Sequence, residues 1–159
     1  MCIRDSCQTM LARAAAKARR RSLRLVLVEA DALQLPFAEA SFDVVTAAFG
    51  FRNLANYARG LAEIHRVLKP GGAVGILEFA LPPPGIFREL YRFYFQRVLP
   101  WLGNTLSGRA GAYNYLPASV EQFPDCAGFA AWLRDAGFAN VTHSRWTGGI
   151  VALHLGEKS

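Results

Sequence analysis

A charged and an amide side chain stand together where an apolar stretch ends. The sequence from Ala47 to Asn53 reads AAFGFRN, so Arg52 and Asn53 follow directly on residues that are apolar enough to be buried. A guanidinium stays protonated and must reach water, a carboxylate or a ligand. Such a pair can stabilise a developing negative charge and orient a hydroxyl or a water molecule. The alternative is that Arg52 forms an ion pair with a carboxylate such as Glu78.

Two carboxylates occupy similar places in the chain. Asp31 follows the apolar run LRLVLV, and Glu78 lies near the end of the run AVGILEF. Asp31 can bind a ligand or cap a turn ahead of LQLPF. Glu78 can form a buried ion pair or line the edge of a substrate site.

The elements that must position these residues alternate between strands and helices. Near-continuous apolar runs predict strands over Leu23–Val28, Phe42–Phe49 and Ala73–Phe79, and a helix over Leu54–Leu68 that the KPGG sequence ends. This order is typical of parallel strands covered on both faces, with ligands beyond the carboxyl ends of the strands. All four polar residues are therefore expected at that rim.

The flanking segments complete an α/β domain. Helices are predicted over Thr9–Arg21 and Phe123–Gly137, and a hairpin over Val141–Trp146 and Ile150–Leu155, turned by TGG. Between them, the segment from Ile86 to Leu99 is aromatic and apolar apart from one narrow polar stripe. It is either a buried helix or a lid over a hydrophobic substrate or a membrane surface.

Composition restricts the class of protein. The 159 residues are 52% hydrophobic and 19% charged, which suits one folded domain, and no apolar run reaches the length of a membrane span. Three cysteines without C-x-x-C spacing indicate a reducing compartment, and the three dispersed histidines predict no metal site. The net charge is +6, and many of the basic residues lie between Lys17 and Arg24. They form either a solvated helix end or a surface that contacts anionic lipid. No nucleic-acid-binding signature accompanies them.

Five stretches, in order, resemble one enzyme family. They are DALQLPF, FGFRN, RVLKPGGAVGILEFA, YNYLPASVEQFPD and TGGIVALHLG. Together they resemble the class I S-adenosylmethionine-dependent methyltransferases of menaquinone and ubiquinone biosynthesis, which methylate a ring carbon of a polyprenyl quinol. The resemblance implies a Rossmann-like α/β sheet, mostly parallel, with an antiparallel carboxyl-terminal hairpin. Another small-molecule methyltransferase using the same cofactor is an alternative.

The resemblance also assigns site residues. It implies that Arg52 and Asn53 are catalytic and that the cofactor, S-adenosylmethionine, contacts four residues: Asp31, Ala32, Ala48 and Phe49. The quinol would lie against Tyr113, Tyr115 and Glu78. Ala48 and Ala80 depart from the family pattern, which has serine at these positions in some members.

The family's first two strands, with the glycine-rich cofactor loop, have no counterpart in this sequence. We expect residues 7–159 to be the carboxyl-terminal two-thirds of one methyltransferase domain, with a helical lid at about 82–118 and residues 1–6 non-native. The strand Leu23–Val28 would then have no neighbour, so the chain would fold poorly or pair with another copy. Alone it would be inactive, or a non-catalytic fragment that binds a partner or a quinone.

A polyprenyl substrate lives in a bilayer. The resemblance therefore implies a cytoplasmic protein with peripheral contact at the inner face of the membrane.

Overall fold

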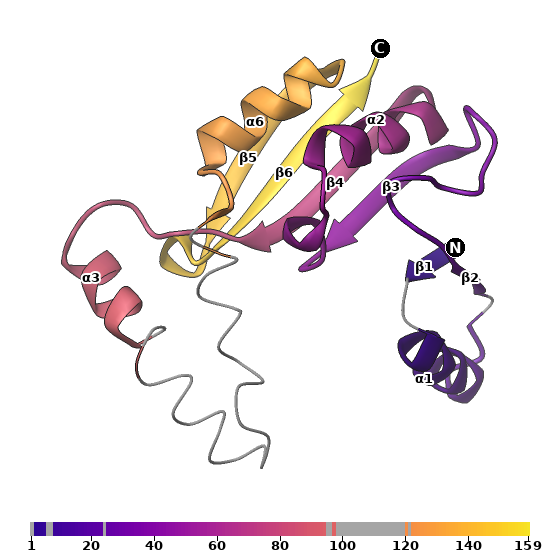
Figure 1. Ribbon diagram of the computed structural model, residues 1–159, viewed down its shortest axis with the longest axis horizontal. Helices are drawn as coiled ribbons and strands as arrows, with labels where there is room; N and C mark the ends of the chain where they lie inside the picture. The colour runs from indigo at the N-terminus through magenta and orange to yellow at the C-terminus, as the bar shows by residue number, and fades with distance from the viewer. Residues whose placement is uncertain (1, 6–7, 24, 95–96, 98–119, 121) are drawn as a thin grey trace.

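The computed structural model describes residues 2–5, 8–23, 25–94, 97, 120 and 122–159. A small unit at the amino-terminal end contains β1 (Cys2–Asp5), α1 (Gln8–Arg20) and β2 (Val26–Glu29). Strands β1 and β2 pair in parallel and form a two-stranded sheet of their own. Figure 1 shows this unit set apart from the larger sheet.

The larger sheet has four strands in the order β3-β4-β6-β5. Strand β3 (Phe42–Ala48) runs parallel to β4 (Leu68–Phe79), and β6 (Val151–Lys158) runs antiparallel to both β4 and β5 (Phe138–Trp146). The hairpin between β5 and β6 turns through η3 (Thr147–Gly149), where Gly148 and Gly149 have φ of 68° and 94°. These left-handed angles suit glycine, and the predicted TGG hairpin is confirmed.

Two helices lie on the same side of this sheet (Figure 1). They are α2 (Tyr57–Val67) and α6 (Cys126–Asp135), and each begins at a side-chain cap. The Asn56 Oδ1 accepts from the Arg59 amide at 3.0 Å, and the Asp125 Oδ1 accepts from the Gly128 amide at 2.8 Å. Their apolar faces pack on β4 in one core, which includes Leu61, Ile64, Val74, Ile76, Phe129 and Leu133.

The other face of the four-stranded sheet corrects the prediction that both faces are covered. The register places Val44 of β3 and Leu155 of β6 on the face opposite Val74 and Ile76. These two residues are 60% and 45% exposed, so the described residues leave this part of the face open. At the end of β4, Phe79 on the same face packs against Tyr91 and Val120. The strands carry no alternation of apolar and polar residues, and this pattern predicted that both faces of the sheet are buried. In the structure, apolar residues on one of the two faces are exposed instead.

Two local predictions are also wrong. Strand β2 does have a neighbour, because β1 pairs with it from Cys2 to Asp5. The sequence KPGG does not form a glycine cap after α2, because the helix ends at Val67 and residues Leu68 to Gly72 already belong to β4. Leu68 adopts an extended conformation with ψ of 141°, and the chain passes directly from helix to strand.

The remaining described helix, α3 (Ile86–Phe93), lies beyond the end of the sheet (Figure 1), where its buried Tyr91 packs against Phe79 of β4. It follows the PPP sequence after β4 and reaches back to the hairpin turn. A Cβ on Gly148 would lie 2.9 Å from the Phe87 ring, and one on Gly149 would lie 2.8 Å from Pro83, so both glycines permit close packing. Most of the predicted lid at 82–118 lies outside the described residues.

Candidate functional site

The rim beyond β3 and β4 is formed by a sharp change of backbone direction. Phe49 has φ of 54°, a left-handed conformation that is uncommon for a bulky residue. Its amide donates to the Leu77 carbonyl at 2.9 Å, which extends the pairing of β3 with β4 by one residue. Its ring, 41% exposed, lies 4.7 Å from the ring of Phe79. The chain then enters η1 (Phe51–Asn53), which carries the two predicted catalytic side chains.

Arg52 is buried in an ion pair. Its Nη1 donates to the Glu78 Oε1 at 2.9 Å and to the Phe49 carbonyl at 2.9 Å, and its backbone amide donates to the Glu78 Oε2 at 3.1 Å. Arg52 is 7% exposed and Glu78 is 1% exposed. The guanidinium carbon also lies 5.4 Å from the centre of the Phe79 ring. The carboxylate alternative raised for Arg52 is therefore present in the structure, and its partner is Glu78.

Asn53 is exposed at the same rim. One contact there escaped the sequence analysis: the Tyr57 hydroxyl donates to the Arg52 carbonyl at 2.8 Å. Tyr57 also stacks on Phe51, a core residue, with ring centres 6.0 Å apart. The rim is therefore held by two sets of contacts: Tyr57 joins it to the core through Phe51, and the Arg52 ion pair joins it to Glu78 of β4. It holds five of the predicted residues: Ala48, Phe49, Arg52, Asn53 and Glu78.

Asp31 lies on a different segment, the connection between β2 and β3. Its carboxylate is exposed, and its Oδ1 accepts from the Leu33 amide at 2.9 Å. Asp31 therefore caps a turn, which was one of the two roles considered for it from the sequence. Ala32 beside it is half-buried. The contacts of Asp31 lie within its own turn, and none of them joins it to the rim.

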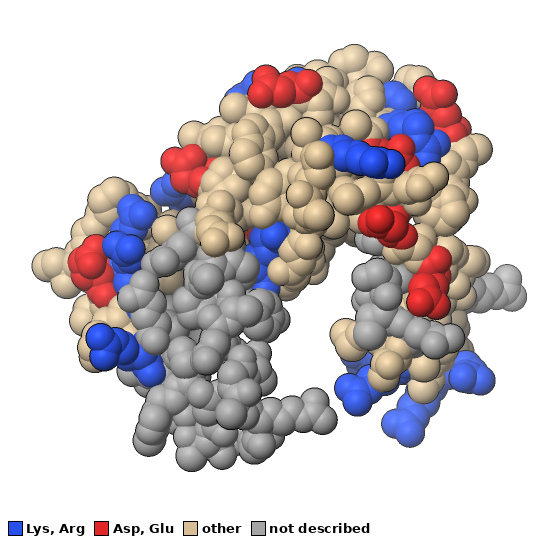
Figure 2. Space-filling view, in the orientation of Figure 1, with Lys and Arg blue, Asp and Glu red and all other residues tan. Residues whose placement is uncertain are grey.

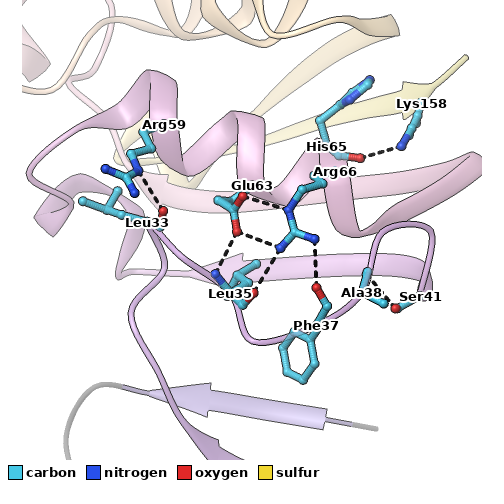
Figure 3. Close-up of polar contacts among 10 residues, drawn as sticks. All are labelled: Leu33, Leu35, Phe37, Ala38, Ser41, Arg59, Glu63, His65, Arg66 and Lys158. Carbon is cyan, nitrogen blue, oxygen red and sulfur yellow. Dashed lines mark hydrogen bonds and ion pairs between the residues drawn. The ribbon is translucent and has the colours of Figure 1, made fainter.

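The connection from Asp31 to Phe37 is held by helix α2 (Figure 3). The side chains of Arg59, Glu63 and Arg66 make hydrogen bonds to its backbone. The sequence analysis did not single out these residues. Their i, i+3 and i, i+4 spacing on one helix was the signal that could have found them, since it places all three on one face.

The other predicted features lie elsewhere. Tyr113 and Tyr115 lie outside the described residues. No group of three or more potential metal ligands occurs within the described part of the chain. Among its helices, none is long and apolar enough to cross a membrane. Two surface hollows lie along α1 and α3, and neither is lined by a predicted site residue.

A statistical model of the ubiE/COQ5 methyltransferase family matches residues 1–158. A demethylmenaquinone methyltransferase of Thermus thermophilus is 51% identical over 154 residues, which are 97% of this chain and 70% of that protein. The chain belongs to the ubiE/COQ5 methyltransferase family.

Another relative is the ubiquinone/menaquinone biosynthesis C-methyltransferase of a Geobacter species, 44% identical over 93% of this chain and 63% of its own length. The chain thus spans about two-thirds of the length of these curated relatives. Among solved structures, a methyltransferase from Aquifex aeolicus superposes with a TM-score of 0.68 at 16% identity, covering 99% of this chain and 68% of the other.

Membership of the ubiE/COQ5 family confirms the predicted family and enzyme class, a methyltransferase that uses S-adenosylmethionine. The structural match confirms the predicted Rossmann-like fold, here with parallel and antiparallel strands in one sheet. The residues present suit that cofactor, because the exposed Asp31 carboxylate can accept a hydrogen bond from an amino group. The exposed Phe49 ring offers an apolar surface at the rim.

Proposed function

We propose that this chain is part of an enzyme that methylates a ring carbon of a polyprenyl quinol, either demethylmenaquinol or a polyprenyl-methoxy-benzoquinol. One observation carries the proposal: 51% identity to a demethylmenaquinone methyltransferase across 97% of the chain. The arrangement of the rim supports it, because polar groups gather where a doubly wound sheet takes its ligands.

The cofactor, when bound, supplies an electrophilic methyl group. On the protein side, Asp31 accepts a hydrogen bond from the adenine amino group and Ala32 contributes its backbone beside it. Ala48 and Phe49 form an apolar wall at the end of β3. This assignment uses the exposed oxygens of Asp31 and the exposed part of the Phe49 ring, both of which remain accessible.

A ring carbon becomes a good nucleophile when a neighbouring hydroxyl loses its proton. Asn53, exposed at the rim, orients that hydroxyl or a water molecule that takes its proton. Arg52 stabilises the developing phenolate through its charge rather than acting as a base. Because Glu78 is already paired with Arg52, this effect is smaller than that of an isolated guanidinium. Glu78 then sets the position of Arg52 and borders the substrate side, while Tyr113 and Tyr115 complete that side.

Helix α3 is where we propose contact with the bilayer that holds the substrate. Its side chains Ile86, Leu90 and Phe93 are 84%, 63% and 63% exposed. Arg88, Arg92 and Arg97 follow along the same segment, and Figure 2 shows Lys and Arg gathered there. Apolar side chains beside cations suit an interface with anionic headgroups. The protein would then work in the cytoplasm, at the inner face of the membrane.

The mechanism makes a requirement of the substrate. The full gene product should methylate demethylmenaquinol only in its reduced form, because only that form can become a phenolate. A quinol with both hydroxyls capped as methyl ethers is the matched control and should not react. Methyl transfer to the capped quinol at a similar rate would contradict the proposed activation.

A further inference from the structure

The segment Asp31–Phe37 contains no helix or strand and is fixed from outside. Its internal bonds are the isolated bridge between Asp31 and Gln34 and the bond from the Leu33 amide to the Asp31 carboxylate. Four of its backbone groups instead bond to side chains of α2, as Figure 3 shows for the residues that it labels. Arg59 Nε donates to the Leu33 carbonyl at 3.0 Å, and the Leu35 amide donates to the Glu63 Oε2 at 2.8 Å.

Arg66 makes the other two contacts. Its Nη2 donates to the Leu35 carbonyl at 3.0 Å, and its Nη1 donates to the Phe37 carbonyl at 2.8 Å. A planar guanidinium with its donors in a fixed fork can bind two carbonyls at once, whereas an ammonium cannot match this geometry.

Glu63 and Arg66 also hold each other. Arg66 Nε lies 2.8 Å from the Glu63 Oε1, and Arg66 Nη2 lies 2.9 Å from the Glu63 Oε2. The Arg66 side chain is 35% exposed and the Glu63 side chain is 18% exposed. The hydrogen bond from Arg66 lowers the pKa of Glu63, so the pair stays charged at neutral pH. An ordinary i, i+3 ion pair stabilises only its own helix, and only slightly. This pair also binds both backbone polar groups of Leu35: Glu63 accepts from the amide and Arg66 donates to the carbonyl.

Helix α2 therefore connects the two parts of the candidate site. Its amino-terminal end follows η1 directly through the Asn56 cap, and its side carries the segment that begins at Asp31. Past Phe37 the chain reaches the carboxyl-terminal end of α2, where the Ala40 and Ser41 amides donate to the Arg66 and Val67 carbonyls at 3.1 and 2.8 Å.

We infer that Glu63 and Arg66 are positioning residues for cofactor binding: they fix the segment that carries Asp31 and Ala32 relative to the rim at the other end of α2. The inference rests on the proposed function, because Asp31 and Ala32 are cofactor residues only there. Neither Glu63 nor Arg66 touches the cofactor itself. Their effect is on the free energy needed to order the segment when the cofactor binds.

The test has one arm that needs no activity. Hydrogen exchange of the full gene product, followed by mass spectrometry, reports the Leu35 and Phe37 region in the unmodified protein and in its Glu63→Gln and Arg66→Lys variants. Both variants nearly keep side-chain length: Arg66→Lys removes the guanidinium fork, and Glu63→Gln removes the charge and one of the two acceptor oxygens that Arg66 and the Leu35 amide use. We expect exchange to rise by roughly tenfold in this region and to stay unchanged in β4 and β6.

In the second arm, the same variants of the full gene product are titrated with S-adenosylmethionine. We expect the dissociation constant to rise by roughly tenfold while kcat at saturation stays within about twofold, because positioning is lost and the reacting groups are intact. Lys69→Ala is the matched control, since it breaks another ion pair, Lys69 to Asp43 at 2.8 Å, away from this segment. It should change neither measurement.

A swap of the two charges separates positioning from simple ion pairing. Glu63→Arg with Arg66→Glu restores attraction along the helix but places a carboxylate against the Leu35 and Phe37 carbonyls. We expect no recovery of affinity. Recovery by the swap, or an unchanged dissociation constant in Glu63→Gln and Arg66→Lys, overturns the inference. Failure of the unmodified gene product to bind the cofactor instead contradicts the proposed function, and the inference falls with it.

Discussion

Arg52 lies against Glu78 and Phe79 beneath the rim, and this burial changes what a substitution there reports. A charge on a residue that is 7% exposed has lost most of its hydration, and only the opposite charge beside it offsets that cost. Removing one partner therefore leaves the other charge buried and strongly destabilises the protein. A loss of activity in a single variant would therefore mix catalysis with folding. The pair has to be changed together.

We expect Arg52→Ala alone to lower the free energy of unfolding by about 3–5 kcal/mol, because it leaves the Glu78 carboxylate buried without an opposite charge, held only by backbone amides. Arg52→Gln combined with Glu78→Gln keeps hydrogen-bonding groups at both positions and should stay within about 1 kcal/mol of the unmodified protein. Urea unfolding measures both. If the double variant folds normally and its kcat is also normal, Arg52 has no electrostatic role in methyl transfer.

His154 is a second buried titratable residue, 2% exposed, with Phe129 of α6 at 4.9 Å and His143 of β5 at 5.6 Å between ring centres. Burial lowers its pKa from 6.5 to about 4, helped by the nearby charges of His143 and Arg145. Its Nε2 contacts the Cys126 carbonyl at 3.3 Å. The ring is therefore neutral in the folded protein near neutral pH.

The sign of the pH dependence follows from this lowered pKa. Between pH 6.5 and about 4 the unfolded chain binds a proton at His154 that the folded chain does not. The free energy of unfolding therefore falls as the pH drops, by about 2 kcal/mol near pH 5 from this residue. His154→Gln should remove that part of the slope in urea unfolding, and His143→Gln on the exposed side should keep most of it. Equal slopes in the unmodified protein and in His154→Gln would contradict the assignment.

At the scale of elements, β3 and β4 come close together at Gly72. A Cβ there would lie 2.9 Å from the Lys69 carbonyl oxygen and 3.0 Å from the Asp43 carbonyl oxygen. Both are backbone atoms, so β3 would have to move away from β4 and the backbone of β4 itself would have to shift at Lys69. Gly71, with φ of 74°, has nothing within 4 Å of such a Cβ.

We expect Gly72→Ala to lower the free energy of unfolding by about 3 kcal/mol through overpacking. Gly71→Ala should cost about 1 kcal/mol, from the left-handed backbone alone. Thermal or urea unfolding of the two variants gives the comparison. The reverse order, with Gly71→Ala the more damaging, would show that the β3–β4 contact does not limit this position.

Several elements could be predicted from the sequence because local signals determine them. The TGG turn, the apolar runs of β3 and β4, and the residues that begin and end α6 all lie within a residue or a few of their predicted places. The sequence also predicted that Arg52, Asn53 and Glu78 lie at one rim, because each comes at or just after the carboxyl end of a predicted strand. The exit from α2 was wrong because Leu68, paired with Phe42, extends β4 back to the helix, and this long-range pairing outweighs the local KPGG signal.

The contacts that fix Asp31 could not be predicted in this way. Glu63 and Arg66 act on backbone groups about thirty positions away, and backbone acceptors leave no mark on residue type. The sequence likewise could not decide whether Arg52 contacts a ligand or forms an ion pair, because that depends on whether the Glu78 side chain is close enough to pair with it. That is a question of strand order, because the two residues are far apart in the chain.

At the scale of the whole molecule, the four-stranded sheet has an apolar face with Val44 and Leu155 exposed, and β3 is an edge strand. An open face of this kind favours association. The 159-residue chain should therefore form larger species as its concentration rises, in sedimentation velocity. Val44→Lys on the open face should reduce this association, while Lys17→Ala on α1 should not. A single monomeric species over a wide range of concentration would contradict this expectation.

The central claim is that the rim beyond β3 and β4 belongs to an enzyme that methylates a quinol ring at carbon. The most direct measurement is the carbon NMR spectrum of the product after the full gene product acts on reduced demethylmenaquinol, with S-adenosylmethionine labelled in its methyl group. We predict one labelled methyl signal, bonded to a ring carbon. A labelled methyl bonded to oxygen, or no labelled quinol at all, would contradict the account.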